Sequence, residues 1–333
     1  MPVVCAVTVT YADRFEALCK PTIERAFRAG VDRIVVVDNG STLSSAQSLR
    51  AFSLERPKVM LISREHNEGS AAAFGIALAA ATDTHPDFIW LLDDDNWVEP
   101  STLEQLLKVQ AEAATRYDDP LTAVCASREP NGFHERVRAG ASVDSVYPPV
   151  GAFLSFDLWS YLARRVRKPT TPTTDSPAIP YAPYGGLLIH NDILTQVGPP
   201  RKDFVLYADD TYWTSQIVRC GHRIVLATGV LISDADRKWL ASDKTNSVAS
   251  IMQKDHPARL YLSTRNQAWV DHQRLRHGAE RVRYAVNRLV ITTVAWISAR
   301  RNHSMQNFSL FRSATMHAEA GDLSHSPRLK ECG

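Results

Sequence analysis

Three adjacent aspartates and an asparagine, Asp93-Asp94-Asp95-Asn96, follow an apolar segment of the chain. Neighbouring carboxylates repel one another unless a cation neutralises them. In an extended segment alternate side chains point to the same side, so Asp93 and Asp95 would present their oxygens together. Such a pair suits a hard divalent cation, Mg²⁺ or Mn²⁺, that keeps coordination positions free for phosphate oxygens. The alternative is a solvated acidic turn that binds nothing.

A second acidic pair, Asp209-Asp210, follows the apolar residues 204–207 and precedes a helical pattern. One of these carboxylates would serve as a general base if it lies within hydrogen-bonding reach of a substrate hydroxyl. The alternative is that both residues cap the helix, because aspartate is a preferred residue at helix N-termini.

The surrounding sequence alternates strand and helix patterns, and these elements must position both acidic groups. Runs rich in β-branched residues predict strands over residues 3–10, 33–38, 58–63, 88–92 and 121–126, with further ordered segments at 184–190 and 223–227. Helical patterns occupy residues 15–29, 44–52, 70–81, 101–115 and 211–220. The alternation predicts an α/β fold with a Rossmann-like, mostly parallel sheet flanked by helices. Ligands of such sheets bind at the carboxyl ends of the strands, where residues 93–96 lie.

The composition and the missing motifs exclude several classes of protein. The chain has 333 residues and a formal net charge of +2, which argues against a dedicated nucleic-acid binder. It has no Gly-x-Gly-x-x-Gly, Walker A or Gly-x-Ser-x-Gly motif, which argues against dinucleotide-binding, P-loop and α/β-hydrolase sites. The cysteines are scattered, which favours a reducing cytoplasm. We expect neither a signal peptide nor a membrane-spanning segment.

The order of the polar motifs resembles the family-2 inverting glycosyltransferases of the GT-A fold, and most closely a bacterial galactofuranosyl- and rhamnosyltransferase-like branch. The resemblance covers about residues 3–270. The motifs that carry it are Thr8-Val9-Thr10-Tyr11, Val35 to Ser41 (Val-Val-Val-Asp-Asn-Gly-Ser), Asn67-Glu68-Gly69-Ser70, Leu91 to Asn96, Tyr184-Gly185-Gly186, Asp209-Asp210 and Arg265-Asn266.

The resemblance implies a role for each group of residues. Asp93 and Asp95 match the metal-binding Asp-x-Asp motif, and Asp210 matches the catalytic base, with Asp209 beside it. The acceptor would contact Tyr184, Gly185 and Gly186. The nucleotide-sugar donor would contact Thr10, Tyr11, Asp38, Asn39, Arg64, Asn67, Gly69 and Asp94.

The resemblance also implies the division of the chain. We expect a GT-A catalytic domain over residues 1–255 with an irregular acceptor-side insertion at 130–183. A C-terminal helical region at 256–301 and a polar tail at 302–333 would follow.

The sequence departs from the family pattern at two places. The branch completes its metal shell with a histidine after the strand that follows the base helix, whereas this chain has Asp234 there, with Asp236 as a second choice. An all-carboxylate shell would be harder and more suited to Mg²⁺ or Mn²⁺. Several family glycines after Asn67 are serine or alanine. These departures keep open the alternative of a catalytically inactive module that binds a sugar nucleotide or a glycan.

The expected function is metal-dependent, inverting transfer of a sugar to a growing bacterial surface polysaccharide. Galactofuranose is the favoured sugar and rhamnose the next, carried by a UDP- or dTDP-linked donor to a glycan or lipid-linked glycan. A nucleotide-sugar hydrolase is a third hypothesis. The apolar residues of the helix at 279–301 would pack on the chain or on a second subunit, or would lie on a membrane beside its arginines. The expected location is the cytoplasm, with peripheral contact to the inner face of the plasma membrane.

Overall fold

A computed structural model describes residues 2–164, 176–236 and 257–324 of the chain. The chain forms two compact units. The first contains the described residues of Met1–Val143, Thr170–Lys202 and Asp210–Arg237, and the second those of Asp144–Pro169, Asp203–Asp209 and Lys238–Gly333. The region expected as one domain over residues 1–255 therefore contributes segments to both units.

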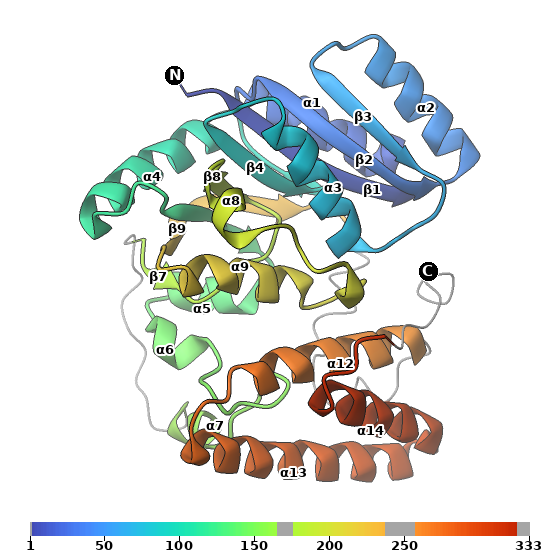
Figure 1. The fold of residues 1–333 in the computed structure, drawn as a ribbon, viewed down its shortest axis with the longest axis vertical. Coiled ribbons are helices and arrows are strands. Elements are labelled where there is room, and N and C mark those ends of the chain that lie inside the picture. The colour runs from blue at the N-terminus through green and yellow to red at the C-terminus, as the bar shows by residue number, and fades with distance from the viewer. Residues whose placement is uncertain (1, 165–175, 237–256, 325–333) are drawn as a thin grey trace. The chain divides into compact units, whose positions relative to one another are not determined.

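The first unit is built on one sheet whose strands run in the order β3-β2-β1-β4-β8-β6-β9-β5, with β7 pairing β9 (Figure 1). The pairs β1–β2, β2–β3, β1–β4 and β6–β9 are parallel, and β8 is antiparallel to both β4 and β6. The strands are β1 (Val4–Ala12), β2 (Arg33–Ser41), β3 (Val59–Arg64), β4 (Phe88–Asp93), β5 (Asn96–Trp97), β6 (Ala123–Glu129), β7 (Ala178–Ile179), β8 (Leu187–His190) and β9 (Ile224–Asp234).

Helices cover both faces of this sheet (Figure 1). The strand residues Val4, Ala6, Ile34 and Val36 form a core with α1, α2 and α4, and the alanine-rich α3 packs on β1 and β2. The helices of this part of the chain are α1 (Lys20–Arg28), α2 (Leu43–Leu54), α3 (Ser70–Thr82), α4 (Thr102–Tyr117), α5 (Gly132–Arg138), α6 (Val143–Val146), α8 (Ile193–Val197) and α9 (Asp209–Arg219). The expected α/β fold with a mostly parallel sheet flanked by helices is confirmed.

The register of the parallel strands gathers polar residues at one edge of the sheet. Thr10 of β1 pairs with Asp38 of β2, and Val9 pairs with Asp93 of β4. The centre of each strand is buried and mainly apolar, because the hydrophobic effect holds it between the two helix layers. Polar side chains near the carboxyl ends of three strands therefore lie side by side where ligands of parallel sheets bind.

The second unit is helical and contains α7 (Leu158–Arg164), α12 (Pro257–Gln273), α13 (Gly278–Arg301) and α14 (Met305–Glu319). Phe153 lies at the centre of an aromatic cluster, with its ring edge-to-face to Tyr284 at 5.4 Å and to Phe311 at 6.5 Å. Residues 302–333 were expected to be a polar tail, whereas the structure has α14 there. The reason is the spacing of its buried residues Phe308, Phe311, Ala314 and Ala318, which gives one apolar helix face.

The buried carboxylate of Asp157 joins α7 to α13 inside the second unit. It accepts hydrogen bonds from Arg283 Nε and Nη2 at 2.7 and 2.6 Å, from Asn287 Nδ2 at 3.0 Å and from the Ser160 N–H at 2.8 Å. The Arg283 guanidinium, together with these other donors, overcomes the effect of burial and holds the pKa of Asp157 well below its usual range.

Replacing Asp157 by alanine is expected to lower the free energy of unfolding by about 2 kcal/mol, because Arg283 and the Asn287 amide lose their acceptor. Asp157 has a lower pKa in the folded chain than in the unfolded one. Its contribution is therefore complete above the unfolded pKa of about 3.9 and is lost as the pH falls through the folded value. Urea unfolding measures the change. The exposed Asp144 provides the control: Asp144→Ala should stay within about 0.5 kcal/mol of wild type, and an equally small change for Asp157→Ala would contradict the assigned role.

Two features of the sequence bear on contact with a membrane: the apolar length of its helices and a run of basic residues. Within the described residues, no helix combines the length and apolar character that crossing a bilayer requires. The sequence also has a basic run, Arg164, Arg165, Arg167 and Lys168, that would be a solvated face or a contact to anionic lipid, and from residue 165 on this run lies outside the described residues.

Candidate functional site

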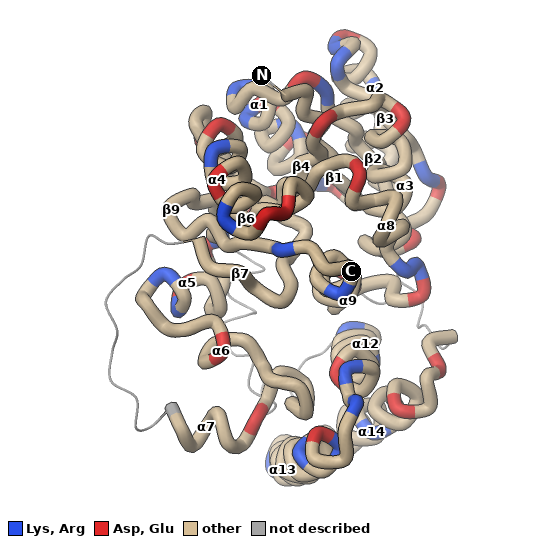
Figure 2. The backbone as a smooth tube through the Cα atoms, turned by 60° about the vertical axis from the view of Figure 1, so that its left-hand side comes forward, with Lys and Arg blue, Asp and Glu red and all other residues tan. Residues whose placement is uncertain are grey.

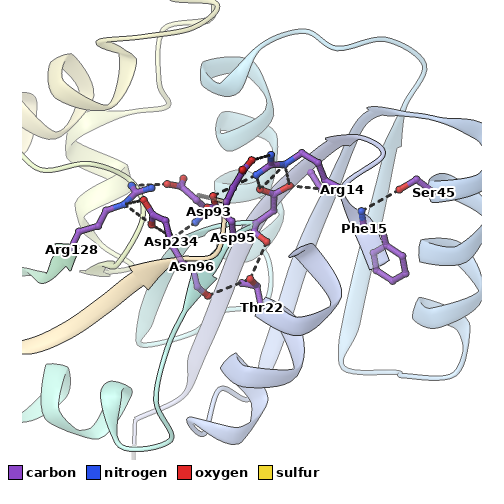
Figure 3. A network of polar contacts seen from close by, with 12 residues as sticks. Arg14, Phe15, Thr22, Ser45, Asp93, Asp95, Asn96, Arg128 and Asp234 are labelled. Carbon is purple, nitrogen blue, oxygen red and sulfur yellow. Dashed lines mark hydrogen bonds and ion pairs between the residues drawn. The ribbon is translucent and has the colours of Figure 1, made fainter. Parts of the chain in front are cut away.

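The acidic residues at the end of β4 lie beside Arg14 and Arg128, which come from two other segments of the first unit, and beside Asn96 of the same motif (Figure 3). Arg128 Nη1 lies 2.7 Å from Asp93 Oδ2, and Arg128 Nε donates to both oxygens of Asp234 at 2.9 and 3.0 Å. The fully buried Asn96 accepts from the Asp93 N–H at 2.9 Å and donates to Asp234 Oδ1 at 3.0 Å. The first aspartate of the motif and the proposed third ligand are therefore brought together through one arginine and one amide.

Arg128 is the main site residue that the sequence analysis missed. It stands near the carboxyl end of β6, whose register places it opposite Ile232 of β9, close to Asp234. The backbone N–H of Arg128 donates to Nδ1 of the buried His134 at 3.1 Å, and burial, together with the Arg128 charge, lowers the pKa of His134 to about 3. The available signal was its position, as the first charged residue after a strand that ends at the same sheet edge as Asp93.

A second arginine pairs with the remaining acidic residues. Arg14 donates from Nε and Nη2 to the carboxylate of Asp94 at 2.8 to 3.2 Å, and its Nη1 lies 2.7 Å from Asp236 Oδ2. Thr10 Oγ1 also donates to Asp94, at 2.9 Å. Both oxygens of Asp94 are thus engaged inside the protein, which makes Asp94 an anchor between β1 and β4 rather than an open contact for a ligand.

Asp95 retains the least compensated charge of the motif. Its side chain is 8% exposed, and its ion pair with Arg14 is long, with Arg14 Nη2 3.6 Å from Asp95 Oδ2. Burial and the negative charges of Asp93, Asp234 and Asp94 raise its pKa to about 7. A cation that approaches a buried carboxyl group with a raised pKa stabilises the ionised form of that group.

The charges of this site fit a divalent cation. Among the described residues, carboxyl groups clearly outnumber the guanidinium groups of Arg14 and Arg128; the acidic members are Asp93, Asp94, Asp95, Asp210, Asp234 and Asp236. All offer hard oxygen ligands, which Mg²⁺ and Mn²⁺ prefer. No three His, Cys, Asp or Glu side chains in the described part of the chain converge as a ready-made metal site. Asp93, Asp95 and Asp234 fit the cation by charge and donor type, while Arg128 holds two of them.

Asp210 lies near this acidic group. It is the second residue of α9, and its Oδ1 accepts from the Thr211 N–H at 2.6 Å. Burial is the main cause that raises its pKa to about 6, and the negative charge of Asp93 adds to it. A carboxylate with a pKa near neutrality is suited to accept a proton. Asp209, expected beside it, is the buried first residue of α9.

The loop that leads into α9 is held by one buried amide within the second unit. It contains three non-glycine residues with positive φ: Val205 at 63°, Tyr207 at 70° and Ala208 at 57°. Asn266 Nδ2 donates at 2.7, 2.8 and 3.0 Å to the carbonyl oxygens of Phe204, Leu206 and Tyr207. These bonds stabilise a backbone conformation that β-branched and bulky residues rarely adopt, and they give the Arg265-Asn266 motif a structural role.

The predicted donor residues Asn39, Asn67 and Gly69 form one hydrogen-bonded group at the end of β2. Asn39 Nδ2 donates to Asn67 Oδ1 at 2.9 Å and to the Gly69 carbonyl at 3.2 Å, and the Gly69 N–H donates to Asn67 Oδ1 at 2.9 Å. Gly40 is required here, because its φ is +79° and a Cβ would lie 2.6 Å from the Asn67 nitrogen. Gly69 precedes α3, so this group places a helix N-terminus, which favours anions, at the sheet edge.

The other residues predicted to contact the nucleotide-sugar donor do not form one group, and each has a different environment. Asp38 is buried and accepts from the Ser41 N–H at 2.9 Å, which shapes the turn after β2. Tyr11 lies under the guanidinium of Arg14, 5.2 Å from ring centre to Cζ. Arg64 is partly exposed and pairs with Glu68 at 2.6 Å, so binding a phosphate would require it to exchange this partner.

The segment predicted near the acceptor reaches the acidic group through its backbone. Tyr184 packs between Phe74 and Trp213, with ring centroids 4.4 and 5.8 Å away. A Cβ on Gly185 would lie 2.7 Å from Asp93 Oδ2 and 2.8 Å from Arg128 Nη1. Gly186 has a φ of +87°, and its N–H donates to the Leu91 carbonyl at 2.9 Å. Only glycine at 185 lets this segment approach Asp93 so closely.

Replacing Gly185 by alanine is expected to reduce catalytic turnover about a hundredfold, because the added methyl group displaces Asp93 and Arg128 from their present positions. Initial rates with a saturating donor measure the effect. Gly132→Ala provides the matched control, since a Cβ there meets nothing within 4 Å. Equal rates for the two variants would show that the contact of Gly185 with Asp93 does not matter.

Comparisons with known proteins agree with this architecture. The family model described as Glycosyl transferase family 2 matches residues 5–161. The structure of GalNAc-T7 with UDP, GalNAc and Mn²⁺ has a TM-score of 0.50 at 14% identity, and the match covers 70% of this chain and 44% of that one. The mannosyltransferase PcManGT of Pyrobaculum calidifontis with GDP-Man and Mn²⁺ has a TM-score of 0.48 at 16% identity, covering 95% of this chain and 87% of that one. No curated protein matches the chain.

The two kinds of comparison support different statements. At these identities a structural likeness shows the fold alone, and this chain spans less than half the length of GalNAc-T7. The sequence match covers β1 to β4 and the acidic motif with its neighbouring donor-side residues. Residues 5–161 therefore match the glycosyl transferase family 2 model, and the chain has a GT-A-like fold.

Proposed function

We propose that this chain is an inverting glycosyltransferase that uses a nucleotide-diphosphate sugar and a divalent cation. The observation that carries the proposal is the placement of Asp210, a buried carboxyl with a raised pKa, near Asp93, the first residue of the motif in which Asp95 retains the least compensated charge. The match to the family 2 model supports it. GalNAc-T7 holds UDP and Mn²⁺ in its structure, and we propose the same classes of ligand here.

Each group of the site has a role in this proposal. Asp93 and Asp95, with Asp234 as a third ligand, would hold Mn²⁺ or Mg²⁺, which when bound supplies Lewis-acid stabilisation of the departing diphosphate. Asn39 and Asn67 hold the N-terminus of α3 toward the donor, and Asp38 lies at the same sheet edge for the nucleoside. Asp94 anchors the motif through Arg14.

The reaction is a single displacement. Asp210 accepts the proton of an acceptor hydroxyl, and the resulting oxygen forms a bond to the anomeric carbon. The bond between that carbon and the donor phosphate oxygen breaks, and its electron pair leaves with the nucleoside diphosphate. Because the oxygen attacks from the face opposite the leaving group, the anomeric configuration inverts. No protein nucleophile is needed, and the burial of Asp210 keeps the base near neutral pKa.

We propose galactofuranose as the transferred sugar and rhamnose as the second choice, with UDP or dTDP as the nucleotide. The acceptor would be a bacterial surface glycan, free or lipid-linked, near Tyr184, Gly185 and Gly186. The place of action would be the cytoplasm. These finer assignments rest on the resemblance of the sequence motifs to the galactofuranosyl- and rhamnosyltransferase-like branch.

A mass-spectrometric screen tests the proposal. Purified full-length chain would be incubated with UDP-galactofuranose, UDP-galactopyranose or dTDP-rhamnose and with free or lipid-linked glycans, with and without Mn²⁺. We expect a glycan one sugar longer in the presence of Mn²⁺ and none with EDTA or with Asp93→Ala. Release of sugar without an acceptor would indicate a hydrolase. Calorimetric nucleotide binding without product from any donor would indicate an inactive binding module.

A further inference from the structure

Helix α13 has two different faces within the second unit. Its buried residues, among them Tyr284, Asn287, Ile291 and Ala295, recur every three or four positions and form its packing face. On the opposite face Val282, Leu289 and Trp296 recur every seven positions and are 64%, 68% and 41% exposed, and Ile297 beside them is 38% exposed. We call Val282, Leu289, Trp296 and Ile297 the α13 face. The packing of α13 on its neighbours therefore leaves a second apolar stripe in solvent.

The neighbouring α7 adds aromatic side chains to the exposed surface of the same unit. Trp159, Tyr161 and Leu162 are each about half exposed, at 47%, 46% and 51%. The Leu158 N–H donates to Asn287 Oδ1 at 2.9 Å, and the guanidinium of Arg283 lies 5.4 Å from the ring of Trp159. These contacts fix α7 against the N-terminal half of α13. Exposed tryptophan and tyrosine of this kind are typical of groups that settle at a membrane–water boundary.

The charges of α13 are mainly basic, since Glu280 in its first turn is its one acidic residue. Residues 281–304 contain no Asp or Glu, and Figure 2 marks the basic residues of α13 in blue. Arg283 and Arg288 are paired with Asp157 and Glu319. Arg281 at one end of the helix and Arg300 and Arg301 at the other are exposed. An apolar stripe with arginines at both ends complements a surface that is apolar inside and anionic at its boundary.

We propose that the α13 face docks on a lipid bilayer that contains anionic lipids. The apolar side chains enter the boundary of the hydrocarbon, and the terminal arginines contact the headgroups. A second copy of the chain fits this surface less well, because stacking two such helices would bring Arg281, Arg300 and Arg301 of each copy together with Glu280 as the one acidic residue of each α13. This inference goes beyond the proposed function and does not depend on it.

Co-sedimentation of the full-length chain with vesicles tests the proposal. We expect the chain to bind vesicles of phosphatidylcholine mixed with phosphatidylglycerol, and to bind more weakly to phosphatidylcholine alone or at high salt. Leu289→Asp should weaken binding at least about tenfold, because withdrawing one leucine from hydrocarbon costs that factor or more. Val282→Asp should act in the same direction. Replacing Arg300 and Arg301 by glutamate should remove the preference for the anionic vesicles.

Leu54→Asp is the matched control, because Leu54 is a 78% exposed leucine on α2 in the first unit. This substitution should leave vesicle binding unchanged. The inference is wrong if the wild-type chain stays in solution with the mixed vesicles. It is also wrong if Leu54→Asp reduces binding as much as Leu289→Asp and Val282→Asp do. Concentration-dependent self-association that Leu289→Asp abolishes, without vesicle binding, would assign the α13 face to a second copy instead.

Discussion

Replacing Asp210 by asparagine is expected to lower kcat by a factor of about 10² to 10⁴, the range that a positioned general base contributes. Asparagine has nearly the same shape, and its side-chain oxygen can still accept from the Thr211 N–H as Oδ1 of Asp210 does. It cannot take up a proton from the acceptor hydroxyl. The loss should therefore appear in kcat, with little change in the donor affinity that nucleotide calorimetry measures.

The pH dependence gives an independent check on Asp210. The base works only when ionised, and burial together with Asp93 raises its pKa to about 6. Turnover should therefore rise with pH, reach half of its maximum at or below this value and level off about one pH unit higher, because a cation held by Asp93 lowers the pKa of Asp210. Asp192→Asn, at an exposed position outside the site, should leave both kcat and the pH profile unchanged. A near wild-type kcat for Asp210→Asn with the natural acceptor would remove Asp210 from the role of base.

The sheet could be predicted because its signals are local. The runs at 33–38 and 88–92 are apolar and β-branched enough to require burial on both faces, and the observed β2 and β4 begin at the same residues. Parallel pairing then places the ends of β1, β2 and β4 together, so the nearness of Thr10, Asp38 and Asp93 follows from the strand pattern. Helix α14 was missed because its apolar face is small and lies among polar residues.

The partners of the acidic residues could not be predicted because they depend on tertiary contacts. Arg128 and Asp234 are 106 positions apart, and Arg14 and Asp236 are 222 positions apart. Apart from its position after a predicted strand, nothing in the local sequence distinguishes Arg128 from the many arginines of the chain. The close approach of Gly185 to Asp93 is equally hidden, since it arises where β8 crosses back between β4 and β6. The sequence predicts ligands for a cation but not the arginine that contacts two of them, Asp93 and Asp234.

Arg128 would compete with a bound cation for the same carboxylates. Its guanidinium neutralises Asp93 and Asp234, and these carboxylates are also the proposed ligands of the cation. Burial raises the pKa of Asp234, and Arg128 offsets only part of that rise. Arg128 therefore favours the ionised forms of Asp93 and Asp234 and holds them together, and it would share or yield these oxygens when a divalent cation binds.

Arg128→Met is expected to lower the free energy of unfolding by about 4 kcal/mol at neutral pH without added metal, because two largely buried carboxylates lose their counter-charge. The deficit should shrink as the pH falls, since protonation removes the uncompensated charge. Mn²⁺ should restore more stability to this variant than to wild type, which urea unfolding with and without Mn²⁺ measures. Arg138→Met, which breaks a pair with the exposed Glu129, should cost less than about 1 kcal/mol and gain nothing extra from Mn²⁺. If Mn²⁺ stabilises Arg128→Met and wild type equally, then Arg128 and the cation do not act on the same carboxylates, and the ligand assignment of Asp93 and Asp234 fails with it.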